Sequence, residues 1–504
     1  MLAHLAVRRG EGEREKGRQT RLPPPPPPPP PLHLFSLSLS PSLFHQLRLK
    51  ALHASGDLHA YAAWASASAL QIDLLTLGLA GLGAALLLAA LAFSALFPRK
   101  GRTFLVDFYC YRPPDSQQTT HAELVRGCEA TGRYDEQALA FVRKVMGISG
   151  LGQATFLPDA VRAGLDRPVE VSLALAKEET ERVLFACVAK VLERNHLKAT
   201  DVDALIVNCT AFNPTPSLSA SVVNHFRMKK GVRTFSLHGM GCAASVIAID
   251  LAKDLLAANP GMRIVIAGTE NVLWNLYFGN QRSMLITNCI FRTGGVAYLL
   301  SNRADDGRRA KYVLNHLVRT HLGGDDAAYN AVIQREDDDG LVGVKIGKEL
   351  MGTASKALEA NLTCLGPKVL PLSEKLLFAG NWVGRKVFKA RGLKPYVPDF
   401  KTAFDHFAIH PGGKAVIDGV GKALGLTPRQ CLPMLAPFER YGNTSSSSTW
   451  YAWAFIETEQ GVKKGDRLWQ LAFGSGFKCA SATWTALRDC GEAHDAWTET
   501  PTEK

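Results

Sequence analysis

The stretch of sequence that decides the fold is Phe235-Ser-Leu-His-Gly-Met-Gly-Cys-Ala-Ala-Ser-Val-Ile-Ala-Ile-Asp250. Its Gly-x-Gly turn places Cys242 on the first turn of an apolar helix that runs to about Leu256. Free peptide amides and the helix dipole at such a terminus favour a thiolate, so we expect the pKa of Cys242 to fall below about 8.5. The same amides are suited to holding an oxyanion. Close packing of a small-residue turn is the alternative interpretation of this motif.

Two later segments supply polar side chains that suit the same chemistry. Asp405-His-Phe-Ala-Ile-His-Pro-Gly-Gly-Lys-Ala-Val-Ile-Asp418 places His410 at the end of an apolar strand, before a Pro-Gly-Gly turn. Arg440-Tyr-Gly-Asn-Thr-Ser-Ser-Ser-Ser448 places Asn443 in a Gly-Asn turn before a small-residue helix start. A neutral imidazole and a carboxamide can both donate hydrogen bonds to one oxygen. Taken separately, His410 is better interpreted as a satisfied buried histidine and Asn443 as a helix cap.

The pattern after residue 100 alternates between helix and strand. At 504 residues the chain exceeds the size at which one core usually stops growing, so two packed units are expected. Helices that alternate with strands predict an α/β fold with parallel sheets covered on both faces. The expected elements are a helix over 178–194 and strands over 204–208, 264–267, 297–300 and 471–473.

The amino-acid composition limits which binding partners and metal or redox sites are expected. The ten cysteines form no CxxC pair, so no structural zinc site or redox motif is predicted, and free thiols fit a reducing compartment. The 58 Lys and Arg against 46 Asp and Glu give a net charge of +12, which suits nucleic acid, anionic lipid or coenzyme A phosphates. Because no basic stretch is interleaved with aromatic residues, no nucleic-acid partner is predicted.

The first hundred residues differ from the rest. Residues 1–60 carry a nine-proline run, Pro23 to Pro31, and are interpreted as a disordered tail, a targeting-like segment or an artefact of gene prediction. A membrane anchor is predicted over 61–98, because Leu74 to Phe97 is free of charge and long enough, at about 1.5 Å per residue, to cross a bilayer. The basic stretch that follows predicts that the rest of the chain faces the cytosol. A long buried helix is the alternative.

Together these segments resemble the condensing enzymes of the thiolase fold, such as chalcone synthase, which use a Cys-His-Asn triad in this chain order. The closest resemblance is to the plant 3-ketoacyl-CoA synthases of very-long-chain fatty acid elongation, over about residues 100–487. Four more stretches carry it: Asn208-Cys-Thr-Ala-Phe-Asn-Pro-Thr-Pro-Ser-Leu-Ser219, Gly279-Asn-Gln-Arg-Ser-Met-Leu-Ile-Thr-Asn-Cys-Ile-Phe-Arg292, Leu365-Gly-Pro-Lys-Val-Leu-Pro-Leu-Ser-Glu374 and Phe473-Gly-Ser-Gly-Phe-Lys478.

The resemblance implies a thiolase-like α/β fold in which two related βαβ-type halves form a five-layered core. Residues 99–390 would be the half with the nucleophile, 391–490 the half with the histidine and asparagine, and 491–504 a tail. The implied reaction is a decarboxylative Claisen condensation of malonyl-CoA with a long-chain acyl group held as a thioester on Cys242, which gives 3-ketoacyl-CoA.

Matching by position makes Cys242 the nucleophile and His410 and Asn443 the other triad members. It also implies functional roles for His321 and His406. Oxyanion and backbone support is expected from three glycines, Gly241, Gly474 and Gly476.

One position departs from the family pattern. Many members have a histidine where this chain has Glu439, four residues before Asn443. A carboxylate there is expected to repel anionic malonyl-CoA or to raise the pKa of a neighbouring histidine.

No metal or redox cofactor is expected, because decarboxylation drives carbon–carbon bond formation, and the substrates are acyl-CoA and malonyl-CoA. The resemblance further implies an endoplasmic reticulum membrane location, contact with membrane lipid, a homodimer, and reductase and dehydratase partners for the remaining elongation steps. Two other functions stay open: a polyketide-type condensing enzyme, and a weakly active or scaffolding elongase subunit, the latter motivated by Glu439.

Overall fold

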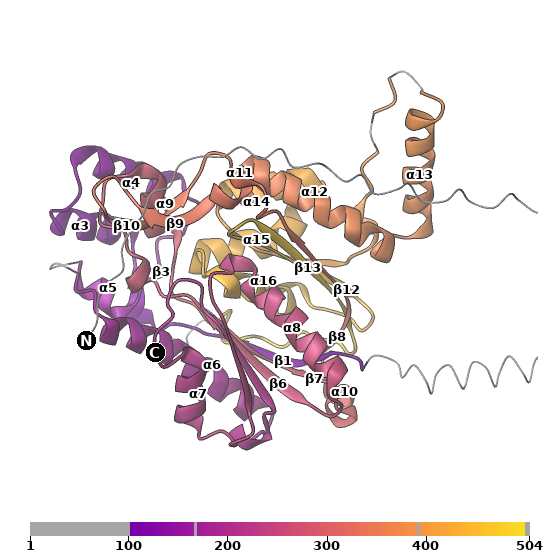
Figure 1. Cartoon of the computed structure of the whole chain (residues 1–504), viewed down its shortest axis with the longest axis horizontal. Coiled ribbons are helices and arrows are strands. Elements are labelled where there is room, and N and C mark those ends of the chain that lie inside the picture. The colour runs from indigo at the N-terminus through magenta and orange to yellow at the C-terminus, as the bar shows by residue number, and fades with distance from the viewer. Residues whose placement is uncertain (1–100, 166–168, 390–391, 395, 499–504) are drawn as a thin grey trace, which may run out of the picture. The chain divides into compact units, whose positions relative to one another are not determined.

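The computed structural model describes residues 101–165, 169–389, 392–394 and 396–498, which belong to one compact unit (Figure 1). The segments predicted over 1–60 and 61–98, and residues 499–504 of the tail, lie outside the described residues. In the described part, no helix is both long enough and apolar enough to cross a bilayer.

Nine strands of the described residues form one mixed sheet, in the order β11-β12-β13-β8-β1-β7-β6-β4-β5. The prediction of parallel sheets is wrong for much of it, because only β4–β5, β4–β6 and β11–β12 are parallel and the other neighbouring strands of this sheet are antiparallel. The strands are β1 Phe104–Cys110, β4 Ala204–Asn208, β5 Arg233–Leu237, β6 Arg263–Thr269, β7 Gly295–Ser301, β8 Tyr312–His321, β11 His406–Ile409, β12 Arg467–Gly474 and β13 Lys478–Ala486. Two small pairs are β2 Gln118–Thr119 with β3 Thr155–Phe156, and β9 Val332–Glu336 with β10 Val342–Ile346.

The four strands expected from the sequence are confirmed within β4, β6, β7 and β12, and the expected helix lies within α6. The helices are α3 His121–Ala130, α4 Glu136–Ile148, α5 Asp159–Ala163, α6 Leu173–Arg194, α7 Leu218–Phe226, α8 Ala244–Ala258, α9 Arg282–Ile290, α10 Ala304–Arg309, α11 Asp326–Asn330, α12 Leu350–Val369, α13 Leu372–Lys386, α14 Lys414–Leu424, α15 Pro428–Tyr441 and α16 Ser448–Phe455.

The sheet consists of two portions joined at a narrow seam. Strands β1 and β8 pair at only two positions, Phe104 with Val313 and Leu105 with Tyr312. Helix α8 bridges the seam, since it contacts β4 and β6 of one portion and β12 and β13 of the other. This position explains its sequence: a helix covered on two sides is apolar nearly all round, and Ala244 to Ile249 are all buried.

Strand residues alternate between two hydrophobic clusters. Ala204 and Ile206 face the cluster that contains α8, whereas Leu205 and Val207 face the cluster built with α6 and α7. In the other portion, Leu468 of β12 faces α8. The next residue, Trp469, faces the cluster that includes residues of α12, α14 and α15. Both faces of the sheet are therefore covered, which is why its strands read as continuous apolar runs.

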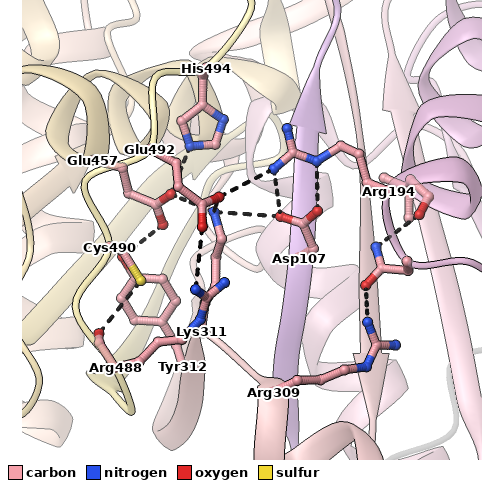
Figure 2. A network of polar contacts seen from close by, with 12 residues as sticks. Asp107, Arg194, Arg309, Lys311, Tyr312, Glu457, Arg488, Cys490, Glu492 and His494 are labelled. Carbon is pink, nitrogen blue, oxygen red and sulfur yellow. Dashed lines mark hydrogen bonds and ion pairs between the residues drawn. The ribbon is translucent and has the colours of Figure 1, made fainter.

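A buried ionic network ties β1, β8 and the C-terminal residues together (Figure 2). The Lys311 ammonium lies 2.7 Å from the Glu457 carboxylate and 3.5 Å from Asp107, and His494 Nε2 lies 2.7 Å from the same Glu457 oxygen. Tyr312 donates its hydroxyl to the other Glu457 oxygen at 2.8 Å. Burial alone would raise the pKa of Glu457, but Lys311 and His494 hold that pKa at about 2. The carboxylate is thus charged and fully partnered inside the protein.

Removing the lysine should expose the cost of this burial. We expect Lys311→Met to lower the free energy of unfolding by about 3 kcal/mol, because the Glu457 charge loses its main counter-ion. The double variant Lys311→Met/Glu457→Met should recover most of that loss. The measurement is the denaturant midpoint of the purified chain. Lys463→Met, which breaks the exposed pair with Asp489, is the control and should cost about 1 kcal/mol or less. An equal effect of the two single lysine variants would contradict the prediction.

Candidate active site

Cys242 lies in a turn that only glycine can build. The chain leaves β5 and enters a short 3₁₀ turn, Gly241–Ala243, that leads directly into α8. Gly241 has φ 67°, and a side chain there would place its Cβ 2.4 Å from the amide nitrogen of Ser475. A Cβ at Gly474 would in turn lie 2.5 Å from the Met240 carbonyl oxygen. The turn after β5 and the turn after β12 therefore touch backbone to backbone, across the two portions of the sheet.

The structure brings most of the sequence-predicted residues to one cavity. A cavity of about 580 Å³ is lined by Cys242, His410, Asn443 and His321, although these residues come from distant parts of the chain. The glycines Gly241, Gly474 and Gly476 line it as well. Its size falls within the range of small-molecule sites. Much of the remaining wall is apolar and includes Val272, Leu276, Ile290, Phe291, Val332, Ile346, Leu350 and Phe473.

Ser445 contacts all three triad residues. Its hydroxyl oxygen lies 3.7 Å from Cys242 Sγ, its carbonyl oxygen accepts from His410 Nε2 at 3.1 Å, and its amide donates to Asn443 Oδ1 at 2.8 Å. Ser445 holds φ at 57°, a left-handed conformation that is unfavourable for a residue with a side chain. Such strain persists where surrounding contacts hold it, and it is concentrated at functional sites. Asn443 also donates its Nδ2 to the Gly412 carbonyl at 3.2 Å.

A buried carboxylate, Glu270, borders the same cavity. It accepts the Ser445 hydroxyl at 3.1 Å and the backbone amides of Thr210 and Ala211 at 3.2 Å each. These contacts connect the loop after β6 to the loop after β4 and to the turn of Ser445. Glu270 is 6% exposed, and Ser445 Oγ, which contacts it, also lies beside Cys242 Sγ.

The expected low pKa of Cys242 is wrong for this site. Burial raises the pKa of the thiol to about 12; the Ser445 hydroxyl opposes that rise and the Glu270 carboxylate adds to it. The amides and dipole of a helix terminus favour a thiolate, but desolvation of the buried sulfur penalises it more strongly here. Before substrates bind, Cys242 is therefore a neutral thiol.

His410 is neutral for the same reason. Burial lowers the pKa of its imidazole to about 4, and the hydrogen bonds with Ser445 and Asn443 offset only part of that effect. Because the Ser445 carbonyl can only accept, His410 carries a proton on Nε2. At neutral pH the site thus holds a neutral thiol beside a neutral imidazole, and neither member is charged in advance.

His321 and His406 differ in their relation to the cavity. His321, at the end of β8, lines it, and its Nε2 lies 3.0 Å from the Gly476 carbonyl oxygen. His406 does not line the cavity, and its Nε2 lies 3.0 Å from Asp466 Oδ2. The physical reason is strand geometry, since His410 lies four residues after His406 and an extended strand rises about 13 Å over that length. The structure therefore gives no support for a direct role of His406 in the reaction.

Glu439 lies outside the cavity as well. It is exposed near the end of α15, and its backbone carbonyl accepts the Gly152 amide at 2.8 Å. Its side chain lies against Gly152 instead of pointing among the lining residues. The expected repulsion of malonyl-CoA by this carboxylate has no geometric basis in the cavity.

Sequence reasoning missed Ser445, Glu270 and Thr210 as members of this site. One signal was available, because Thr210, Cys242 and Glu270 follow the three strands β4, β5 and β6, which run parallel. The carboxyl ends of parallel strands meet at one edge of a sheet, and ligands bind there. The described residues contain no group of three or more His, Cys, Asp and Glu side chains that could hold a metal ion.

Comparison with known proteins agrees with this arrangement. Residues 95–387 match the family described as FAE1/Type III polyketide synthase-like protein, and residues 401–486 match the C-terminal part of 3-oxoacyl-[acyl-carrier-protein] synthase III. Among solved structures, CsyB complexed with CoA-SH is 18% identical with a TM-score of 0.62, covering 76% of this chain and all of CsyB. The type III polyketide synthase domain of Steely1 from Dictyostelium is 16% identical with a TM-score of 0.60, covering 77% of this chain and 99% of that domain. These two likenesses show the fold.

Curated relatives share much more of the sequence. 3-Ketoacyl-CoA synthase 4 of Arabidopsis thaliana is 49% identical over 385 residues, which are 76% of this chain and 74% of that protein. Probable 3-ketoacyl-CoA synthase 20 of Oryza sativa subsp. japonica is 46% identical over 402 residues, which are 80% of this chain and 76% of that protein. With a mixed α/β, thiolase-like fold and this level of identity, the chain belongs to the 3-ketoacyl-CoA synthase family of condensing acyltransferases.

Proposed function

We propose that this protein condenses malonyl-CoA with a long-chain acyl group held on Cys242, releasing carbon dioxide and 3-ketoacyl-CoA. The observation that carries the proposal is the single cavity in which Cys242, His410 and Asn443 meet beneath an otherwise largely apolar wall. An apolar wall suits an acyl chain, because each buried CH₂ contributes about 0.8 kcal/mol. Family membership supports the reaction class.

In the first half-reaction, Cys242 Sγ bonds to the thioester carbon of acyl-CoA and the bond to coenzyme A breaks. The thiol proton passes to the neutral imidazole of His410 as the bond forms, and from there to the departing coenzyme A thiolate. The tetrahedral oxyanion is held by backbone amides of the Gly241 turn and of the Gly474 to Gly476 turn, which line the cavity side by side. This order avoids a free thiolate in a buried site.

In the second half-reaction, malonyl-CoA loses carbon dioxide and leaves an enolate. His410 and Asn443 donate hydrogen bonds to the enolate oxygen, each from an N–H that now points to a carbonyl oxygen. The enolate carbon then bonds to the acyl carbon, the bond to Cys242 Sγ breaks, and the sulfur takes up a proton. His321 lies at the rim formed with Gly476 and is assigned to positioning the incoming thioester.

Several broader features belong to the same proposal. A five-layered core of two related halves, 99–390 and 391–490, follows from family likeness, with β8 of the first range paired to β13 of the second. The uncharged stretch from Leu74 to Phe97 supports an anchor in the endoplasmic reticulum membrane with the catalytic part in the cytosol. A homodimer, and reductase and dehydratase partners, follow from family likeness. No cofactor beyond the two coenzyme A thioesters is needed.

Cys242→Ala should abolish condensation by at least about 10³-fold, because no other side chain can carry the acyl group. The measurement is carbon dioxide release from labelled malonyl-CoA in the presence of a long-chain acyl-CoA, with the products identified. Cys364→Ala, at an exposed free cysteine of α12, is the matched control and should keep full activity. Multiply extended or cyclised products from the unaltered chain would contradict the proposed single extension.

Asn443→Asp should separate the two half-reactions. The new carboxylate still accepts the Ser445 amide but offers no N–H to the enolate and adds a negative charge beside it. We expect stoichiometric coenzyme A release from acyl-CoA to persist while carbon dioxide release falls by about 10²-fold or more. Asn330→Asp, at an exposed residue of α11, is the control. Equal loss of both steps would argue against a specific role in the enolate step.

The pH dependence should follow the low pKa of His410. A protonated imidazole cannot take the thiol proton, and burial keeps this group neutral until the pH approaches 4. We therefore expect the acid limb of kcat/KM for coenzyme A release near pH 4. Between pH 6.5, the ordinary pKa of histidine, and pH 4, His410 binds a proton in the unfolded chain but not in the folded one. The free energy of unfolding therefore also declines as the pH falls through this range. Circular dichroism at each pH separates the two effects. A limb at or above 6.5 in folded protein would overturn the assignment.

A further inference from the structure

Helix α13 (Leu372–Lys386) exposes an unusual number of large apolar side chains. It projects from the end of α12, at the upper right of Figure 1, and Glu374 is its one residue classed as buried. Exposed side chains of this kind continue just past its end, where Phe388 is 76% exposed. A contiguous apolar surface on a soluble domain marks an interaction site. The exposed apolar residues of this surface are Leu372, Leu376, Leu377, Phe378, Trp382, Val387 and Phe388.

Two polar side chains of α13, those of Glu374 and Asn381, contact the returning chain. Glu374 accepts the Tyr396 hydroxyl at 2.7 Å and the Asp399 amide at 2.9 Å. Asn381 donates to the Lys394 carbonyl at 3.0 Å and accepts the Tyr396 amide at 3.0 Å. A helix on a water-facing surface normally shows the opposite arrangement, with polar groups outward. This hairpin is therefore built for an apolar environment on its outer side.

Positive charge gathers at the C-terminal end of α13 and on the returning chain. Arg385, Lys386, Lys389 and Lys394 are exposed, and within the described residues none of them forms an ion pair with an acidic side chain. Leucine, phenylalanine and tryptophan bordered by lysine and arginine are the composition of helices that lie in the interface of anionic membranes. Two copies of this chain pairing through the same surface would bring these cations together, which disfavours self-association.

We propose that α13 and residues 387–389 form an interfacial membrane-binding element that lies in the headgroup region of an anionic phospholipid bilayer. This element is distinct from the anchor proposed over 61–98 and does not depend on the proposed reaction. A second contact would fix the orientation of the catalytic body on the membrane that holds its acyl substrates.

The test uses the full chain reconstituted in vesicles whose acyl chains carry bromine, a contact quencher of tryptophan. The readout is the difference in fluorescence quenching between the unaltered chain and Trp382→Phe. This difference isolates the signal of Trp382 from that of the other tryptophans. We expect clear quenching in phosphatidylcholine with phosphatidylserine, and a fall of about twofold or more in phosphatidylcholine alone or in Arg385→Glu/Lys386→Glu/Lys389→Glu. Leu376→Gln/Leu377→Gln should remove it. Ile148→Gln/Leu173→Gln, at exposed apolar residues elsewhere, is the matched control.

The outcomes separate this proposal from the reaction. Condensation measured in detergent should be unchanged in the α13 variants, because none of their residues lines the cavity. The proposal is overturned if the fluorescence of Trp382 is no weaker in brominated vesicles than in unbrominated vesicles. Two other results would also overturn it: cross-linking between copies of the chain through this helix, and shielding of Trp382 only after another protein is added. Quenching of Trp382 in a chain that releases no carbon dioxide would instead leave the membrane element standing and the proposed reaction refuted.

Discussion

The structure depends on one backbone contact, where the turn carrying Cys242 meets the turn that follows β12. Gly241 and Gly474 lie so close to the opposite backbone that neither has room for a side chain. This contact joins the two portions of the sheet at the end away from the brief β1–β8 pairing, since Gly474 lies opposite Lys478 and Lys478 lies opposite His321, the last residue of β8. It also sets the amides of both turns beside the sulfur. Fold and site therefore rest on the same constraint.

Burial controls the electrostatics of the site. The apolar surroundings that suit an acyl chain also raise the pKa of Cys242 and lower that of His410, so both stay neutral at rest. A neutral pair costs little to bury, whereas a preformed ion pair would carry a desolvation penalty. Ser445 links the pair to Asn443 and Glu270 through its hydroxyl, carbonyl and amide. Charge is thus expected to develop only when a thioester is present to receive it.

Local structure could be predicted from the sequence better than the arrangement of the strands in the sheet. The strand at Ala204–Asn208 and the apolar character of α8 could be read from periodicity, because those patterns reflect which side of an element is covered. The direction of strand pairing could not, since it is set by how elements far apart in the chain return to the sheet. The sequence also could not show that His406 lies apart from the cavity that His410 lines, because this depends on how far β11 carries the chain between the two residues.

By itself the sequence determined the residue types of the reaction and the turn that presents the nucleophile, because glycine spacing and side-chain chemistry are local properties. Family signatures added which cysteine, histidine and asparagine belong together. Only the tertiary structure decided that Ser445 and Glu270 share their cavity, that the Cys242 pKa rises instead of falling, and that α13 turns its apolar side chains outward. These depend on burial and on contacts between distant segments, and no local pattern encodes how much water a folded chain excludes.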